Sequence, residues 1–280
     1  MRTYAVADVF TDVALEGNPV AVFTDGQGLD GDTMQRAARE LNLSETVFVL
    51  PGEDGADATV RIFTPAIEMP FAGHPVLGTA FVLGQRLGSD AIVLKTGAGV
   101  VEVALRREHG AVVYGEMGQP LPTWEPFAQP GELLAALGVD RSELPIEVYD
   151  NGPRHTFVCL PSAAAVAALA PDLGALETLG QVGVSCFALS DGARVKTRMF
   201  GPGLGVPEDP ATGSAAGPLA VHLARHRAIG FGERIEIHQG AEIGRPSTLF
   251  AQVDGAQERL ERVTVGGAAV IVAEGRYRLD

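Results

Sequence analysis

Short runs of alternating apolar and polar residues dominate the chain and predict a mostly β fold with few helices. In the first 120 residues these runs cover residues 4–10, 20–23, 46–50, 58–63, 92–96, 100–105 and 112–118. Helical periodicity interrupts them, and the predicted helices span residues 32–41, 75–87, 131–137, 163–168 and 212–227. A period of two indicates strands and a period near 3.6 indicates helices, so the pattern predicts the α+β class.

Two of the predicted helices are apolar on all sides, at residues 76–84 and 215–221. A helix without a polar face must be buried on every side. In a β-rich chain this predicts a sheet barrel wrapped around a central helix in each half. Gly78 and Gly84 would let strands approach the first of these helices closely.

An internal repeat divides the chain into similar halves. RIFTP at residues 61–65 recurs as RMFGP at residues 198–202, an offset of 137 (198 − 61) in a chain of 280. Self-similarity at half the chain length predicts two pseudo-symmetric domains, with a binding site expected at their junction. The proline-rich segment at residues 119–126 suggests the boundary. We therefore expect lobes at residues 1–120 and 121–280, with the last strand able to return to the first lobe.

Glu45 is the most informative polar residue, because it heads the apolar, β-branched run at residues 43–50. Burying an unpaired carboxylate is costly, so its place suggests a function. A similar run occurs in the second half at residues 184–189, in which Phe187 matches Phe48 and Val184 takes the place of Glu45. One half therefore keeps the acid and the other lacks it.

A tight turn precedes each of the two apolar helices, and these turns carry the other candidate residues. They are Gly73 and His74 in the first half, and Asp209, Thr212, Gly213 and Ser214 in the second. Free N–H groups at helix starts favour anions, so the turns could form a small anion site. Taken singly, Asp209 and Ser214 could be helix caps and His74 a structural histidine. The functional interpretation depends on their occurrence at equivalent places.

Other motifs give weaker predictions. A triad of Ser214, His74 and Asp209 lacks the G-x-S-x-G elbow. His222 and His226 have the spacing of a zinc helix, but no H-E-x-x-H motif is present and no third ligand is evident, so we expect the solvent-facing end of a helix and no metal site. The glycine-rich run at residues 201–205 is interrupted by proline, which makes dinucleotide binding a poor prediction.

Composition narrows the class of protein. The net charge is −14 and the 21 basic residues form no tract, which disfavours nucleic acid as a partner. No signal peptide and no apolar run long enough to cross a bilayer are evident, so we expect a soluble cytoplasmic protein. Cys159 and Cys186 lie in apolar strand-like runs and are expected to be buried small hydrophobes rather than a disulfide or a nucleophile.

Several runs together resemble the PhzF family, which has the diaminopimelate-epimerase-like fold. They are GNPVAVF at residues 17–23, ARELNLSET at 38–46, PFAGHP at 70–75 and DPATGSA at 209–215. Further runs, at residues 122–125, 146–149, 151–155, 217–220, 222–226 and 242–247, resemble the isomerase of the phenazine pathway in particular. The resemblance extends over essentially the whole chain.

The resemblance implies an isomerase without a cofactor that moves a proton within the ring of trans-2,3-dihydro-3-hydroxyanthranilate, a small anionic cyclic amino acid. It places Glu45 as the proton carrier with His74, Asp209 and Ser214 around the substrate, and it suggests a homodimer. We expect Ser44, Gly73, Thr212, Gly213 and Ser214 to bind the substrate. An epimerase or isomerase of another small amino or hydroxy acid, or an idle metabolite-binding protein, remains an alternative.

Overall fold

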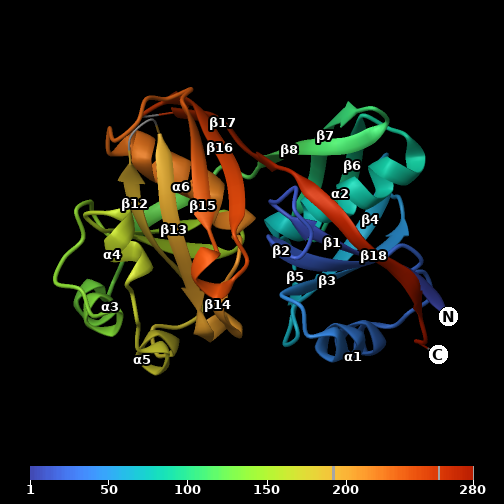
Figure 1. Cartoon of the computed structure of the whole chain (residues 1–280), viewed down its shortest axis with the longest axis horizontal. Coiled ribbons are helices and arrows are strands. Elements are labelled where there is room, and N and C mark those ends of the chain that lie inside the picture. The colour runs from blue at the N-terminus through green and yellow to red at the C-terminus, as the bar shows by residue number, and fades with distance from the viewer. Residues whose placement is uncertain (191–192, 258, 280) are drawn as a thin grey trace. The chain divides into compact units, whose positions relative to one another are not determined.

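The computed structural model describes residues 1–190, 193–257 and 259–279. The chain forms two compact units, of which one comprises residues 1–118 and 266–280 and the other residues 119–265. We call these the N-terminal and the C-terminal unit. Each consists of a curved sheet around a central helix, with one outer helix in the N-terminal unit and several in the C-terminal unit (Figure 1).

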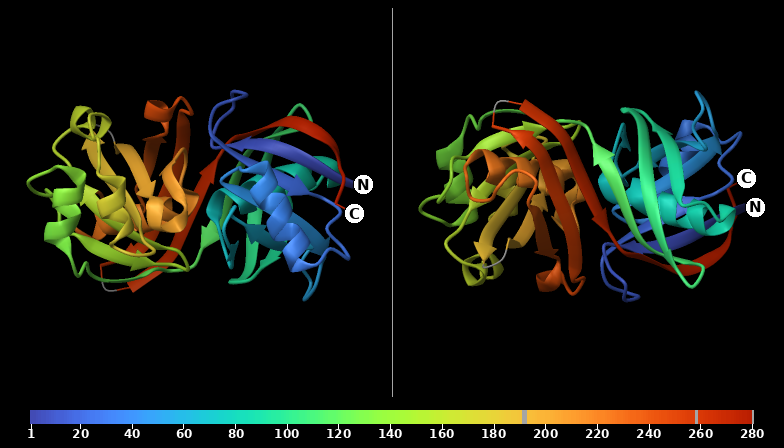
Figure 2. Two further views of the ribbon diagram at one scale, coloured as in Figure 1. Left: turned by 90° about the horizontal axis from the view of Figure 1, so that it is seen from below. Right: turned by 90° about the horizontal axis from the view of Figure 1, so that it is seen from above.

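In the N-terminal unit the sheet surrounds α2 (Gly73–Leu87), and α1 (Gly31–Leu41) lies on its outer side (Figure 1). The strands are β1 (Arg2–Val9), β2 (Asn18–Phe23), β3 (Glu45–Pro51), β4 (Ala58–Phe63), β5 (Glu68–Met69), β6 (Ala91–Thr96), β7 (Gly99–Glu108), β8 (Ala111–Gln119) and β18 (Ala269–Tyr277). Strand β18 pairs antiparallel with β1, which brings the two chain ends side by side (Figure 2).

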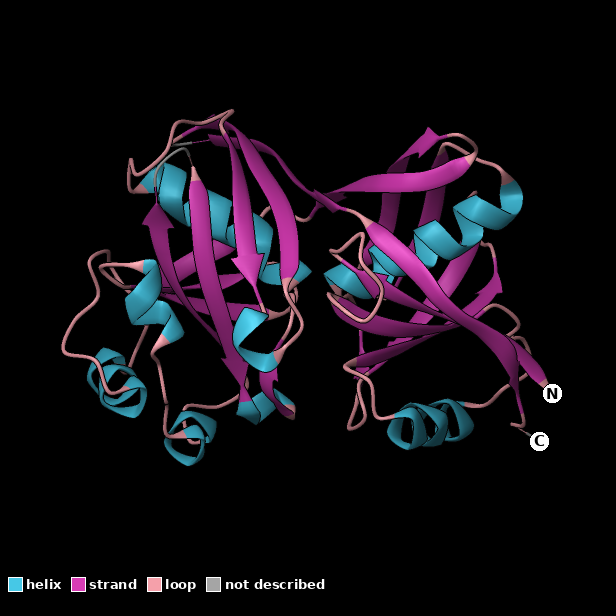
Figure 3. Ribbon diagram, in the orientation of Figure 1, coloured by secondary structure: helices cyan, strands magenta, loops and turns pink. Residues whose placement is uncertain are grey.

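In the C-terminal unit the central helix is α6 (Gly213–Arg225), and α3 (Pro130–Leu137), α4 (Ala163–Ala167) and α5 (Leu173–Glu177) lie outside the sheet (Figure 3). The strands are β9 (Thr123–Pro126), β10 (Glu147–Asp150), β11 (Arg154–Cys159), β12 (Gly183–Ser190), β13 (Arg194–Gly201), β14 (Val206–Asp209), β15 (Arg234–Gln239), β16 (Ser247–Ala256) and β17 (Arg259–Gly267). Two short 3-10 helices, η1 (Pro202–Leu204) and η2 (Ala241–Ile243), complete the unit.

The strand pairings of the two units follow the same sequence, which confirms the predicted duplication. Strands β2 and β3 are parallel, β3 and β4 antiparallel, and β4 and β6 parallel again. The same alternation joins β11 to β12, β12 to β13 and β13 to β15. Helix α2 connects β5 to β6 as α6 connects β14 to β15. The two central helices therefore occupy equivalent places.

Both central helices are buried as their apolar sequences predict. Residues 73–82 of α2 are all buried, and so are residues 213–224 of α6. A Cβ at Gly78 would lie 2.5 Å from Cγ1 of Val20, and one at Gly84 would lie 2.2 Å from Cδ1 of Leu105. These two glycines therefore let β2 and β7 pack directly against the helix, as the sequence predicted.

The repeated arginines on β4 and β13 have equivalent surroundings. Arg61 binds Glu68 with Nη2 to Oε2 at 2.6 Å, and its guanidinium lies 5.1 Å from the centre of the Phe63 ring. Arg198 binds Glu208 with Nη2 to Oε2 at 2.8 Å and lies 4.9 Å from the Phe200 ring. These matched contacts align β4 with β13 residue for residue.

This alignment corrects the predicted match of Val184 to Glu45. Thr46 pairs with Phe63, and Val184 pairs with Phe200, so Val184 occupies the place of Thr46. Gly183 is then the counterpart of Glu45. Successive side chains of a strand alternate between the two faces of a sheet, so a slip of one residue exchanges the inner and outer faces.

The packing agrees with the corrected register. Val184 and Cys186 belong to the outer core of the C-terminal unit, together with Val166 of α4 and Leu176 of α5. Phe48 likewise packs on the outer side, against α1. Phe187, by contrast, makes an edge-to-face contact with His222 of the central helix. The apparent match of Phe187 to Phe48 therefore joined residues on opposite faces of the sheet.

Candidate functional site

Glu45 and His74 lie together in the N-terminal unit. Glu45 is the first residue of β3, and His74 is the second residue of α2. The Oε2 atom of Glu45 lies 3.2 Å from Nε2 of His74, and the two side chains are 15 % and 5 % exposed. Ser44 immediately precedes β3 and is half-buried. The sheet thus places a carboxylate beside an imidazole at the start of the central helix.

Burial lowers the pKa of His74 from 6.5 to about 3, and a hydrogen bond to the backbone of Pro19 only partly opposes this effect. At neutral pH the imidazole is therefore uncharged. A neutral imidazole has one N–H, and the bond to Pro19 uses it, so Nε2 faces Oε2 of Glu45 as an acceptor. When Glu45 has gained a proton, its O–H can donate to Nε2, so the pair suits a carboxyl group that accepts and returns a proton.

Asp209, Thr212 and Gln239 form a polar cluster in the C-terminal unit. The Thr212 hydroxyl donates to Oδ2 of Asp209 at 2.6 Å, and both residues are buried. The Gln239 amide donates to the Asp209 carbonyl at 2.7 Å and to the Thr212 hydroxyl at 3.0 Å. The acid does not cap α6, because the residue before that helix is Thr212. Gln239 was not foreseen, since it lies on β15, far from the turn in sequence.

Ser214, the second residue of α6, is buried and contacts a histidine that the sequence analysis did not single out. The Ser214 hydroxyl lies 3.0 Å from Nε2 of His155 on β11. The two residues are 59 apart in sequence, so no local motif could reveal the contact. A signal was present all the same, because His155 lies in the run at residues 151–155 that resembles the phenazine isomerase.

The starts of both central helices leave backbone donors available. Gly73 and Gly213 are the first residues of α2 and α6, and among the described residues no side chain caps either start. Uncapped N–H groups carry partial positive charge and favour a carboxylate nearby. The role of these two glycines in binding an anion stays a prediction.

His222 and His226 differ from their prediction, because neither forms a solvent-facing helix end. His222 is fully buried and His226 is partly buried. The Oε2 atom of Glu147 lies 3.5 Å from Nδ1 of His222 and 2.9 Å from Nε2 of His226. A third ligand atom is therefore present, and the ligand atoms of these three residues lie within 4.8 Å of one another. Arg225 also binds Glu147, with Nη1 to Oε2 at 2.7 Å. The guanidinium supplies the positive charge that a metal would bring.

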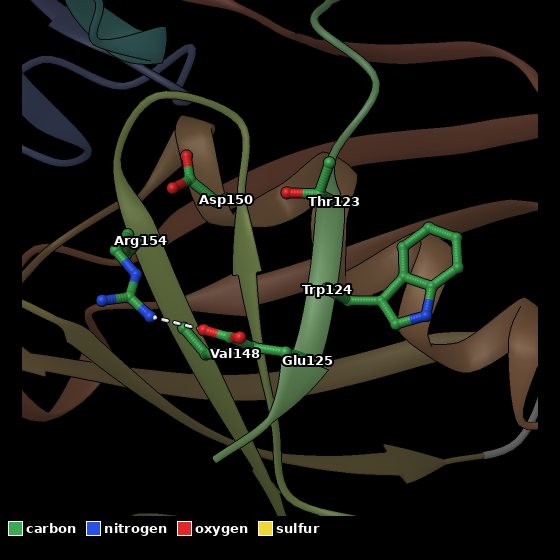
Figure 4. A pocket seen from close by; sticks show the side chains of 6 residues that line it. All are labelled: Thr123, Trp124, Glu125, Val148, Asp150 and Arg154. Atoms are coloured by element: carbon green, nitrogen blue, oxygen red, sulfur yellow. Dashed lines mark hydrogen bonds and ion pairs between the residues drawn. The ribbon is translucent and has the colours of Figure 1, made fainter. Parts of the chain in front are cut away.

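A hollow on the surface of the C-terminal unit lies over β9, β10 and β11 (Figure 4). Across it, Arg154 donates to Oε1 of Glu125 at 3.1 Å, and the two side chains are 50 % and 68 % exposed. An ion pair as exposed as this contributes at most about 1 kcal/mol. The hollow contains none of the candidate residues and carries no chemical assignment.

The profile of the PhzC-PhzF family, described as phenazine biosynthesis-like protein, matches residues 7–275. The chain belongs to this family. A trans-2,3-dihydro-3-hydroxyanthranilate isomerase of Pseudomonas aeruginosa is 55 % identical over 279 residues, which cover 100 % of each chain. The match over nearly the whole length confirms the predicted resemblance to the PhzF family.

Solved structures confirm the fold. A predicted epimerase from Pseudomonas aeruginosa superposes with a TM-score of 0.84 at 34 % identity, covering 99 % of each chain. A hydroxyproline epimerase from Agrobacterium vitis superposes with a TM-score of 0.68 at 16 % identity, covering 98 % of this chain and 91 % of that one, and shows the fold alone. The PhzF chain thus has the diaminopimelate-epimerase-like α+β fold. None of its described helices is long and apolar enough to span a membrane.

Proposed function

We propose that this PhzF chain isomerises trans-2,3-dihydro-3-hydroxyanthranilate in phenazine biosynthesis, without a cofactor, and that Glu45 carries the proton. The observation that supports this assignment most directly is the contact of 3.2 Å between Glu45 and His74 at the start of a buried helix. It is supported further by the full-length identity of 55 % to an isomerase of that name.

The reaction requires one carbon–hydrogen bond to break and another to form. The ring carbon that bears the hydroxyl loses its hydrogen as a proton, because only this loss produces an enol at that oxygen. The double bonds shift along the ring, and another ring carbon gains a proton. The enol then becomes a ketone, as its hydroxyl proton passes to solvent and a ring carbon of the enol takes up a proton in exchange. No electrons enter or leave, so one carboxylate that accepts and returns a proton completes the balance.

Glu45 suits this shuttle because His74 is neutral near pH 7 and offers Nε2 as an acceptor to the carboxyl group once that group has gained a proton. In our proposal, His74 and Asp209 position the amine and hydroxyl end of the substrate and assist the enol. Ser214 and the amides of Gly73 and Gly213 bind its carboxylate, with Ser44 and Thr212 lining the substrate. Hydrogen bonds from helix-start amides to a carboxylate are charge-assisted and therefore strong.

Two-base epimerisation is the second candidate, since a predicted epimerase is among the similar structures. Inversion on this fold normally uses a cysteine from each half. The two turns carry His74 and Ser214 instead, and both cysteines are buried elsewhere. Burial raises the pKa of the Cys159 thiol to about 11 and that of Cys186 further, so neither is a thiolate at neutral pH. These residues favour the one-base isomerase.

Reaction in D2O separates the candidate functions. The purified chain is incubated with trans-2,3-dihydro-3-hydroxyanthranilate, and in parallel with a panel of amino and hydroxy acids, while NMR follows the substrate and the isotope content. An isomerase converts the cyclic substrate and leaves the α-hydrogens of the panel in place. Exchange of an α-hydrogen without isomerisation would support the epimerase, and no change in any sample would indicate a metabolite-binding protein.

A further inference from the structure

We propose that His155 is a positioning residue that orients the Ser214 hydroxyl, so that the hydroxyl hydrogen points to the substrate carboxylate. The inference rests on the proposed role of Ser214 in binding that group. It goes further by naming the residue that fixes the direction of the hydroxyl, which a serine at a helix start does not fix by itself.

The packing holds the His155 ring in one place. His155 is 1 % exposed, and its Nε2 lies 3.0 Å from Oγ of Ser214. On the other side of the ring, a Cβ built at Gly183 would lie 2.6 Å from Nδ1. His155 and Gly183 are paired across the parallel strands β11 and β12. Only a residue without a side chain at position 183 leaves room for this imidazole, so the ring is wedged between β12 and the start of α6.

The surroundings of the ring favour one tautomer. Nδ1 is buried and has no hydrogen-bond partner among the described residues. A buried N–H without a partner is rarer and costlier than a buried acceptor without one. The proton therefore resides on Nε2, which donates to the Ser214 oxygen. The hydroxyl, having accepted this bond, is left to donate its own hydrogen elsewhere.

The backbone around Ser214 is held as firmly as its side chain. The Asn151 amide donates to the Ser214 carbonyl at 3.0 Å, and the Gln119 amide donates to the Gly213 carbonyl at 2.8 Å. All of these groups are buried. With the two carbonyls fixed by amides and the hydroxyl oxygen fixed by His155, the hydroxyl hydrogen is the part of the Ser214 side chain that remains free to meet a ligand.

The alternative role of His155, a base that activates Ser214 as a nucleophile, fits the geometry less well. In serine nucleophiles a third group binds the far nitrogen of the histidine and stabilises its charged form. Here that nitrogen faces Gly183. Burial also lowers the pKa of His155 to about 4, and Asp150 only partly offsets this, so the imidazolium is disfavoured.

The test compares variants of His155 that keep or remove the donor. His155→Leu removes it, whereas His155→Gln retains an amide N–H of similar reach. We expect His155→Leu to raise both KM and the Kd of 2-amino-3-hydroxybenzoate, a planar analogue that cannot isomerise, by about tenfold while kcat changes less than threefold. We expect His155→Gln to restore both constants to within about threefold of the wild type. His226→Gln serves as the matched control, and thermal melts confirm that each variant is folded.

Ser214→Ala distinguishes failure of this inference from failure of the proposed role of Ser214. If Ser214→Ala raises KM and Kd, His155→Leu should have no further effect in that background. An increase with Ser214→Ala but none with His155→Leu would refute the positioning role alone. No increase with Ser214→Ala would refute the carboxylate-binding role on which it rests. Covalent labelling of Ser214 by an organophosphate would show a nucleophile instead and overturn the inference.

Discussion

The two units use one pattern of strands to present different chemistry at the start of a buried helix. In the N-terminal unit Glu45 of β3 contacts His74 of α2, with 3.2 Å between Oε2 and Nε2. In the C-terminal unit the counterpart of Glu45 is Gly183, and the neighbouring strand supplies His155, which contacts Ser214 of α6 at 3.0 Å. By strand register, His155 occupies the place of Val20.

In the proposed function, this difference divides the reaction between the two halves of a duplicated scaffold. The duplication keeps a side chain of the sheet in contact with the second residue of the central helix, while the type of side chain changes. An acid with a neutral imidazole suits proton transfer, and a hydroxyl oriented by an imidazole suits recognition of a carboxylate. The glycine at position 183 leaves room for the histidine.

The largest effect should come from removing the acid of the N-terminal unit. We expect Glu45→Gln to reduce kcat by 10²- to 10⁴-fold, which is the range for a general acid–base group, while the Kd of 2-amino-3-hydroxybenzoate changes little. Steady-state kinetics and titration calorimetry measure the two quantities. Glu102→Gln, on the exposed face of β7, is the matched control. Turnover of Glu45→Gln at the wild-type rate would exclude this residue as the base.

The matched arginines test how far the two scaffolds are energetically equivalent. The side chains of Arg198 and Glu208 are 9 % and 14 % exposed, and Arg198 also donates to the Leu169 carbonyl at 2.6 Å. Those of Arg61 and Glu68 are 32 % and 44 % exposed. We expect Arg198→Met to lower the free energy of unfolding by about 3 kcal/mol and Arg61→Met by about 1 kcal/mol or less. Equal losses in urea titrations would contradict the comparison.

Filling the space at the counterpart of Glu45 should disturb the serine side of the comparison. We expect Gly183→Ala to cost about 1 to 3 kcal/mol of stability, because its methyl group would overlap the His155 ring. We expect a higher KM as well, since a displaced ring cannot hold Ser214. Gly131→Ala in α3, where no atom lies within 4 Å of the added methyl, is the control and should not destabilise the fold. Unchanged stability and KM for Gly183→Ala would argue against the wedge.

The smallest expected effect is a dependence of stability on pH. The folded state lowers the pKa of His155 from 6.5 to about 4, so below pH 6.5 the unfolded chain binds the extra proton. The contribution of the neutral His155 to the free energy of unfolding is therefore fully present above pH 6.5. It is lost as the pH falls toward 4, by up to about 1.4 kcal/mol per pH unit. Urea titrations at pH 7.0, 6.0 and 5.5 should show a smaller loss for His155→Gln than for the wild type. Equal losses would mean that His155 is protonated in the folded chain.

Much of the fold could be predicted from hydrophobic periodicity, because long helices and alternating strands carry strong local patterns. The central helices and α1 were predicted within three residues at each end. Helix α5 was missed, because its five residues carry too little periodicity and lack the alanine run that marks the equally short α4. The alignment of β12 with β3 was predicted one residue out of register. Phe187 was matched to Phe48, and the sequence does not show that these two side chains lie on opposite faces of the sheet.

The candidate residues could be predicted only where local sequence marks them. Glu45 stands out in an apolar run, and the turns before the central helices mark His74 and Ser214. The partners of Ser214 and Asp209 arrive through tertiary contacts, His155 from β11 and Gln239 from β15. Glu147 likewise joins His222 and His226 from a distant strand, which is why the pair was expected to face solvent.

Transfer of an isotope label tests the role of Glu45 most directly. The substrate carries deuterium on the carbon that bears the hydroxyl, and one turnover in H2O is followed by mass spectrometry and NMR. Because the Glu45 side chain is only 15 % exposed, the account predicts that part of the deuterium reappears on the new carbon of the product. With Glu45→Gln the label should remain on the substrate. Release or transfer of the label by Glu45→Gln at the wild-type rate would contradict the account.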